Sequence, residues 1–163
     1  MIETLLALAL HLPDSTSVTG GQTSSDSTAT SRELSLHAPS RGAYSSAIRE
    51  AAEVPTQHRA WAACVLDRES GGTLDRKHSG ERAKNPSSTA AGRWQFLKPW
   101  QYGGSFMVKD RLVRYGMPDQ QARKVRKYLA KTPIHLWDGY WQDILFNEAV
   151  HRGGKHHWDG GSC

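Results

Sequence analysis

The chain has 163 residues and a mean hydropathy of −0.62. No apolar run approaches the ~20 residues of a membrane span, which excludes an integral membrane protein. The length suits one domain, or two only if both are small, and the formal net charge is +5.

The aromatic residues divide the chain at Tyr44. All six Trp, five Tyr and three Phe lie at or beyond it, whereas residues 1–43 have no aromatic and a net charge of −2, so residues 44–163 carry +7. Eleven of the eighteen residues from 14 to 31 are Ser or Thr, a composition that cannot bury enough apolar surface to fold. We therefore expect an N-terminal appendage and disordered linker over residues 1–43 and one folded domain over residues 44–163.

The first ten residues contain a short apolar run from Leu5 to Leu10. The run is shorter than a secretory signal's apolar core, and Glu3 stands where such signals carry Lys or Arg. A short helix that docks elsewhere is the favoured interpretation, with a signal peptide as the alternative.

Hydrophobic spacing and helix-ending residues predict a mostly helical domain. In chain order, the first two expected helices are 44–54 and one between the N-cap Thr56 and Gly71. A short helix is then expected to start at 98–101 and to break at Gly103-Gly104. The remaining helices are 106–115, 118–131 with Pro118 as its first residue, and 139–152. Residues 73–97 combine charge, Gly, Asn-Pro and Ser-Ser, which indicates turns and a small hairpin. The fold class is therefore α+β, mostly α, with a core that includes Trp61, Trp141 and Phe146.

Glu69 is the residue of greatest chemical interest. It ends a helix on which Trp61, Cys64, Val65 and Arg68 are spaced along one face, with Trp61 and Val65 expected to be buried. Two glycines follow it, so that a ligand can approach the backbone. A carboxyl partly shielded from water is more easily kept protonated, and a protonated carboxyl can serve as the general acid of glycosidic cleavage. The alternative is a helix-end residue paired with Arg68, Arg76 or Arg82.

The residues from Cys64 to Gly104 resemble the lysozyme-like domains of lytic transglycosylases and resuscitation-promoting factors, particularly versions from actinobacteria and their phages. The matching segments are Cys64-Val65, Glu69-Ser70-Gly71-Gly72, Asn85-Pro86-Ser87-Ser88, Ala90-Ala91-Gly92-Arg93-Trp94-Gln95-Phe96-Leu97, Trp100 and Gly103-Gly104, and then His157-Trp158 and Cys163 at the end of the chain. The resemblance implies a small lysozyme-like lobe and an essential acid at Glu69. It implies no cofactor.

The same resemblance implies a glycan groove beside Glu69. We expect Gln95 to hydrogen-bond sugar hydroxyl and N-acetyl groups, and Trp94, Trp100 and Tyr102 to lie against sugar faces. Gly92 would let the hairpin backbone approach the ligand, and Ser70 would also contact substrate. Ordinary core packing is the alternative for each aromatic residue.

The chain departs from the family pattern at two positions and in the basic segment after Gly104, which is longer than the family pattern. Thr73 replaces the usual Asn, and Arg93 stands where a small residue, Leu or Tyr is usual. We expect the first to alter only a turn and the second to change how one subsite contacts substrate.

A second carboxylate would decide the type of reaction. Hydrolysing glycosidases use two, whereas lytic transglycosylases use one, because the C6 hydroxyl of the sugar attacks and leaves a 1,6-anhydro ring. Asp75 is the candidate second carboxylate, and its alternative is a turn residue held by Arg76 or Lys77.

The two cysteines, Cys64 and Cys163, fit the end-to-end disulfide of the family. Such a bond presumes an oxidising compartment, and the alternative is two unpaired thiols. His151, His156, His157 and Cys163 lack the spacing of a zinc site, so we expect no metal.

A basic segment over residues 109–131 holds eight Lys and Arg against two Asp. A solvated helix face, attraction to the anionic polymers of a cell wall and nucleic-acid binding are the three interpretations. Its poorly interleaved aromatics disfavour nucleic acid.

Together these observations predict an enzyme that cleaves the β-1,4 bond between N-acetylmuramic acid and N-acetylglucosamine in peptidoglycan, either as a lytic transglycosylase or as a lysozyme. We expect it outside the cell, at the cell wall or on a phage virion, where residues 1–43 would contact phage structural proteins. The alternative is a virion or cell-surface protein that binds peptidoglycan without cleaving it.

Overall fold

The computed structural model describes residue 42 and residues 44–163, and the expected linker and appendage over residues 1–43 lie almost wholly outside this part. The described helices are α2 (Ser45–Ala52), α3 (Arg59–Ser70), α4 (Trp100–Arg114), α5 (Asp119–Leu129) and α6 (Gly139–His151), with short 3₁₀ turns η1 (Thr56–His58), η2 (Ile134–Leu136) and η3 (Gly154–His157). The expectation of a mostly helical domain is confirmed.

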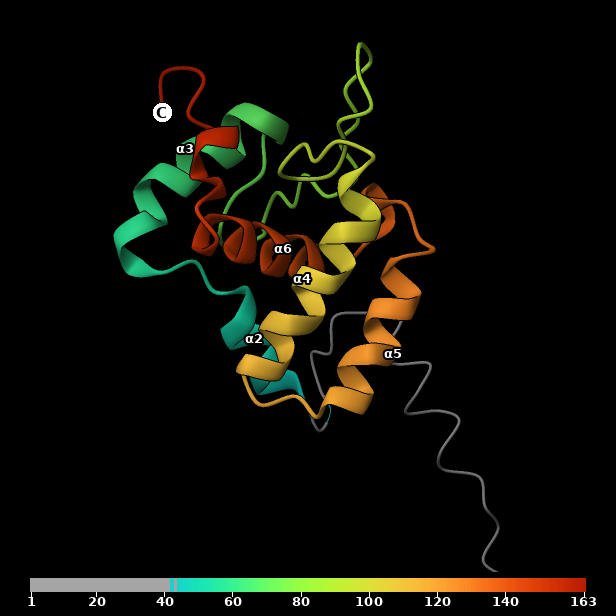
Figure 1. Cartoon of the computed structure of the whole chain (residues 1–163). Helices are drawn as coiled ribbons and strands as arrows, with labels where there is room; N and C mark the ends of the chain where they lie inside the picture. The colour runs from blue at the N-terminus through green and yellow to red at the C-terminus, as the bar shows by residue number, and fades with distance from the viewer. Residues whose placement is uncertain (1–41, 43) are drawn as a thin grey trace, which may run out of the picture.

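Helix α6 lies at the centre of the fold, as the sequence predicts for 139–152. Its N-cap is Asp138, whose side chain accepts a hydrogen bond from the backbone N–H of Tyr140 at 3.0 Å. Its side chains are buried from Trp141 to Ala149, and α2 and α4 pack against it (Figure 1). Helix α5 lies along α4 on the other side.

Helix α4 passes through Gly103 and Gly104 without a break, so the expectation of two separate helices is wrong. A Cβ on Gly104 would lie 2.8 Å from Cδ2 of Leu145 on α6. The glycine therefore allows the two helices to approach closely, and this tertiary packing outweighs its weak helix propensity. Pro118 is likewise the N-cap of α5 and not its first helical residue.

Residues 71–99 contain turns, as predicted, but the expected hairpin is reduced to isolated antiparallel bridges. These bridges join Lys84 to Ala91 and Ala91 to Phe96. Within the described residues no regular strand forms.

The inner face of α3 matches the expected one only in part. The buried positions are Ala62, Val65 and Leu66, whereas Cys64 and Arg68 are exposed and Trp61 is only partly buried. Cys64 lies on the exposed side of the helix, where it forms the disulfide with Cys163, with 5.7 Å between the Cα atoms. The predicted pairing is confirmed, and it ties the C-terminus beside α3 (Figure 1).

A buried ion-pair cluster fastens α4 to α6. The Glu148 carboxylate is completely buried and accepts hydrogen bonds from Arg114 at 2.9 and 3.0 Å and from Arg152 at 2.8 Å. Arg111 lies 3.7 Å from it and also donates to the carbonyl of Ala51 on α2. The arginines of the basic segment thus serve in part to hold three helices together.

We expect this cluster to make the protein acid-sensitive. Burial alone would raise the pKa of Glu148, but hydrogen bonds from Arg114 and Arg152 outweigh it and hold the pKa below the ordinary 4.5. The unfolded chain therefore takes up a proton first, and the free energy of unfolding falls as the pH drops below about 4.5 through the folded-state pKa. Denaturant titrations between pH 7 and pH 3 measure this dependence.

The control for the acid prediction is Glu148→Gln. It should destabilise the protein by about 3 kcal/mol at pH 7, because three arginines lose a buried counter-charge. Its stability should also depend less on pH below about 4.5. Equal pH dependence in the two proteins would contradict the assignment of acid sensitivity to this carboxylate.

Candidate active site

Glu69 lies in the last turn of α3. Gly71 ends the helix in the left-handed conformation, with φ at +66°, and its N–H donates to the carbonyl of Asp67. The Glu69 side chain is 24% exposed, so its carboxylate is half-shielded at the surface.

Arg68 is the ion-pair partner of Glu69, as the alternative interpretation allowed. Its Nε and Nη2 donate to Oε1 of Glu69 at 3.1 and 2.8 Å, and Nη2 also donates to the carbonyl of Trp158 at 2.9 Å. Both bonds from Arg68 end on Oε1, and among the described residues nothing donates to Oε2. Oε2 is therefore the oxygen of Glu69 that is free to meet a ligand.

Ser70 fastens the end of α3 to the loop around Arg93. Its hydroxyl donates to the carbonyl of Arg93 at 2.8 Å and lies 3.2 Å from the carbonyl of Leu66. A Cβ on Gly80 would lie only 2.3 Å from this hydroxyl oxygen, so the turn at residue 80 closes over it. Ser70 was expected to contact substrate, but its hydroxyl proton is donated within the fold, to the carbonyl of Arg93.

Gly92 is buried, and its role differs from the expected one. Its φ is +80°, and a Cβ would lie 2.2 Å from Oε1 of Gln142 on α6. The same Gln142 oxygen accepts the backbone N–H of Arg93 at 2.7 Å. Gly92 therefore lets the loop approach α6 and not a ligand, which corrects the expectation.

Gln95 lies at the tip of this loop between two buried aromatic residues. It has a φ of +53°, a conformation that a residue with a side chain adopts only where its surroundings impose it. Its Nε2 donates to the carbonyl of Gly92 at 2.9 Å, and the side chain is partly exposed. The amide oxygen accepts no bond among the described residues and is available to a donor group of a ligand.

The three aromatic residues expected to hold glycan do not form one platform. Trp94 is fully buried, stacks on Phe146 with 3.5 Å between ring centroids and donates from Nε1 to Asp143 at 2.8 Å, so the expectation that it holds glycan is wrong. Trp100 is half-buried and lies edge-on to His157. Tyr102 is 64% exposed, and its ring centroid lies 5.3 Å from that of Phe106. Trp100 and Tyr102 face different ways because they are two positions apart on one helix.

Trp158 links Trp100 to the surroundings of Glu69. Its ring lies edge-on to Phe96, against which Trp100 also packs, and its carbonyl accepts the bond from Arg68. Glu69 and Trp100 are therefore connected through Trp158, whereas Tyr102 lies on another face of α4.

Asp75 has the contacts of a turn residue. Its Oδ1 accepts bonds from the hydroxyl of Thr73 at 2.6 Å and from the backbone N–H of Lys77 at 3.1 Å. The Thr73 hydroxyl is the main cause of a lowered pKa for Asp75, followed by the Lys77 backbone. These contacts match the alternative that the sequence left open, with Lys77 as the partner.

Arg93 and Asp143 form a buried ion pair beneath the site. The two side chains are almost completely buried, with Arg93 Nε 2.8 Å from Asp143, and Asp143 also accepts a bond from Arg76 at 2.6 Å. Arg93 donates to the carbonyls of Thr73 and Ser79, and Gln142 donates to that of Glu81. Burial raises the pKa of Asp143, against the opposing charge of Arg93, and burial lowers the pKa of Arg93.

This ion pair corrects the expectation that Arg93 changes how a subsite contacts substrate, since its side chain is inaccessible. Sequence reasoning did not identify the pair, although one signal was present. A carboxylate such as Asp143 on a helix expected to be buried on all sides requires a cationic partner.

The basic segment offers fewer free charges than its composition suggests. Lys109 pairs with Asp110 and Asp119, and Arg123 pairs with Asp119. Among the described residues, no group of three or more His, Cys, Asp or Glu is arranged to hold a metal ion. In that same part of the chain, no helix is both long and apolar enough to cross a bilayer.

Comparisons with known proteins add no assignment. No family model matches the chain, and neither the curated proteins nor the solved structures contain a match.

Proposed function

We propose that this protein cleaves peptidoglycan glycan strands at the MurNAc-β-1,4-GlcNAc bond, with Glu69 as the general acid. The observation that carries the proposal is the contact between the two segments that bear the family resemblance. Ser70, next to Glu69, is hydrogen-bonded to Arg93, two residues before Gln95. The acid and the amide expected to bind sugar thus belong to segments that are fastened to each other.

In this mechanism Glu69 Oε2 carries the proton, because Oε1 is occupied by Arg68. The proton passes to the glycosidic oxygen as the bond to C1 breaks. Gln95 accepts a hydrogen bond from an N-acetyl N–H through its free amide oxygen, and Trp100 lies against a sugar face.

A one-carboxylate reaction fits the surroundings of Asp75 better than a two-carboxylate one. Thr73 and Lys77 hold Asp75 in an exposed turn, so we propose that it takes no part. The C6 hydroxyl of the MurNAc then attacks C1 and gives up its proton to Glu69, which restores the acid. The product is a 1,6-anhydro ring, and the enzyme is a lytic transglycosylase.

Mass spectrometry of purified cell walls incubated with the protein tests the reaction. We expect new MurNAc ends that are lighter than reducing ends by one water, and none with Glu69→Gln protein. Reducing ends would contradict the one-carboxylate mechanism while leaving cleavage intact. The absence of any new end would contradict cleavage itself.

A protein that binds peptidoglycan without cleaving it is the second candidate function. The Arg68–Glu69 ion pair favours it, because a carboxylate held this way can serve structure alone. This candidate predicts that the protein sediments with purified walls yet leaves their glycan strands intact.

We also propose that the protein acts outside the cytoplasm, at the cell wall or on a phage particle. The Cys64–Cys163 disulfide supports this, since such bonds persist in oxidising compartments.

A further inference from the structure

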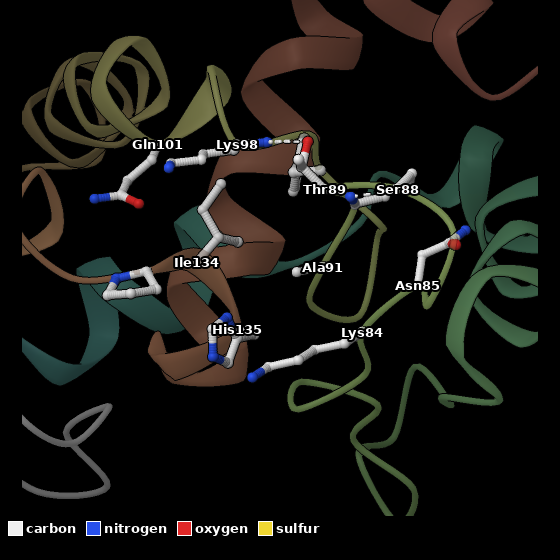
Figure 2. A pocket seen from close by; sticks show the side chains of 12 residues that line it. Lys84, Asn85, Ser88, Thr89, Ala91, Lys98, Gln101, Ile134 and His135 are labelled. Atoms are coloured by element: carbon white, nitrogen blue, oxygen red, sulfur yellow. Dashed lines mark hydrogen bonds between the residues drawn. The ribbon is translucent and has the colours of Figure 1, made fainter.

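A groove lined by Lys84, Lys98 and His135 lies outside the surroundings of Glu69. It is formed between residues 84–91, the start of α4 and the turn η2, and its volume is about 290 Å³ (Figure 2). A second hollow shares Thr89, Lys98 and Gln101 with it and extends to Tyr102. We call the two together the Lys84–Lys98 groove.

The charge of this groove is of one sign. Among the described residues that line it none is acidic, and neither Lys84 nor Lys98 forms an ion pair anywhere in the described part of the chain. In Figure 2, Lys84 extends toward His135 and Lys98 toward Gln101, with Ile134 between them. Two ammonium groups without an acidic partner among the described residues thus lie toward the two ends of one cavity.

Three uncharged polar groups of the groove also present donors, whereas the amide N–H of Gln101 is used on the carbonyl of Ala130. The side-chain oxygens of Asn85, Ser88 and Thr89 each accept a backbone N–H, from Ser87, Ala90 and Lys98 respectively. Among the described residues, nothing accepts a bond from the hydroxyl protons of Ser88 and Thr89 or from the amide hydrogens of Asn85, so these hydrogens are available to a ligand. Cations and free donors together suit a ligand with anionic oxygens.

The floor of the groove narrows the choice of anion. It consists of apolar groups, namely Ala90, Ala91, Phe96, Pro133 and Ile134. An uncharged glycan would leave the two lysines without a counter-charge, and a phosphate polymer would leave the apolar floor without an apolar partner. A short peptide with carboxylates and small apolar side chains uses both.

We propose that the Lys84–Lys98 groove binds the carboxylates of the short peptide that each MurNAc carries, an identification of the ligand that rests on the proposed function. Tyr102 is exposed at one end of the groove, and Lys98 and then Lys84 follow along it, so a peptide can enter the groove from its Tyr102 end. The groove would then select glycan strands that still bear peptides.

Binding of the dipeptide acetyl-L-alanyl-D-glutamate to the full chain tests the proposal, with its uncharged diamide as a second ligand. Chemical-shift titration should give an affinity at least about tenfold lower for the diamide, because the charge-assisted hydrogen bonds are lost. The variant K84Q/K98Q should weaken binding of the dipeptide by a similar factor. The matched control K124Q/K127Q removes two exposed lysines from α5 and should change the affinity less than about twofold.

Three outcomes would overturn the proposal: equal binding of the diamide, unchanged binding by K84Q/K98Q, or inorganic phosphate binding as tightly with the same lysine dependence. The last would reveal a general anion site. Because the dipeptide assay does not depend on Glu69, it separates the two proposals. If walls stay intact yet the dipeptide binds through Lys84 and Lys98, cleavage fails and the peptide site stands.

Discussion

Replacing Glu69 by Gln is expected to reduce the lysis of purified cell walls at least 100-fold. The amide has the size of the carboxyl, and its oxygen can still accept the bonds from Arg68, but it cannot give a proton to the glycosidic oxygen. General acids contribute about 10²–10⁴-fold to such reactions, so the loss should dominate the kinetics. The fall in turbidity of a wall suspension measures the rate.

Asp75→Asn is the matched control for this experiment. It also exchanges a carboxylate for an amide, at a position where the structure shows a turn residue. We expect its lysis rate to stay within about threefold of wild type, since surface substitutions perturb a fold little. Full activity in Glu69→Gln would remove the enzymatic proposal, and a loss in Asp75→Asn as large as that in Glu69→Gln would restore the two-carboxylate mechanism.

Removing the disulfide is expected to cause the largest loss of stability. The bond closes a loop of 99 residues, and in the chain-entropy model its absence costs about 4–5 kcal/mol. For a folded part of this size the melting temperature should fall by about 15–20 °C. Cys64 and Cys163 are both exposed, so the double substitution by Ser opens no cavity, and calorimetry of C64S/C163S measures the effect.

A reducing agent provides the control for the disulfide prediction. It should lower the melting temperature of the wild-type protein to that of C64S/C163S and leave the double variant unchanged. A double variant that melts within about 3 °C of wild type would contradict the prediction, because it would mean that the loop is already closed by other contacts.

The sequence predicted the helices well where one periodic pattern was sufficient. The run from Gly139 to Arg152 is apolar on nearly all sides, and its helix is the centre of the fold. The helix break predicted at Gly103-Gly104 is wrong. Local propensity opposes a helix there, but the contact with Leu145 requires a residue without a side chain at position 104. That contact is long-range and has no local signal.

The candidate site shows the same limit. The resemblance identified Glu69 and Gln95, and the structure places both at partly exposed positions. It also suggested a sugar contact for Trp94, and the departure at Arg93 suggested an altered subsite, but both side chains are fully buried, because a sequence motif does not distinguish an inward side chain from an outward one. The buried partner that both share, Asp143, lies 49 residues away from Trp94 and could not be paired with it from spacing.

The way Arg93 and Gln142 hold residues 73–81 has a consequence for variation in this turn. They donate to the carbonyls of Thr73, Ser79 and Glu81, and every amino acid has such a carbonyl. The path of the turn therefore depends in part on two residues that lie outside it, together with the bonds that Thr73 makes to His78 within it. An exposed position whose side chain takes no part in these bonds, such as His78, can change in charge and size while the turn keeps its shape.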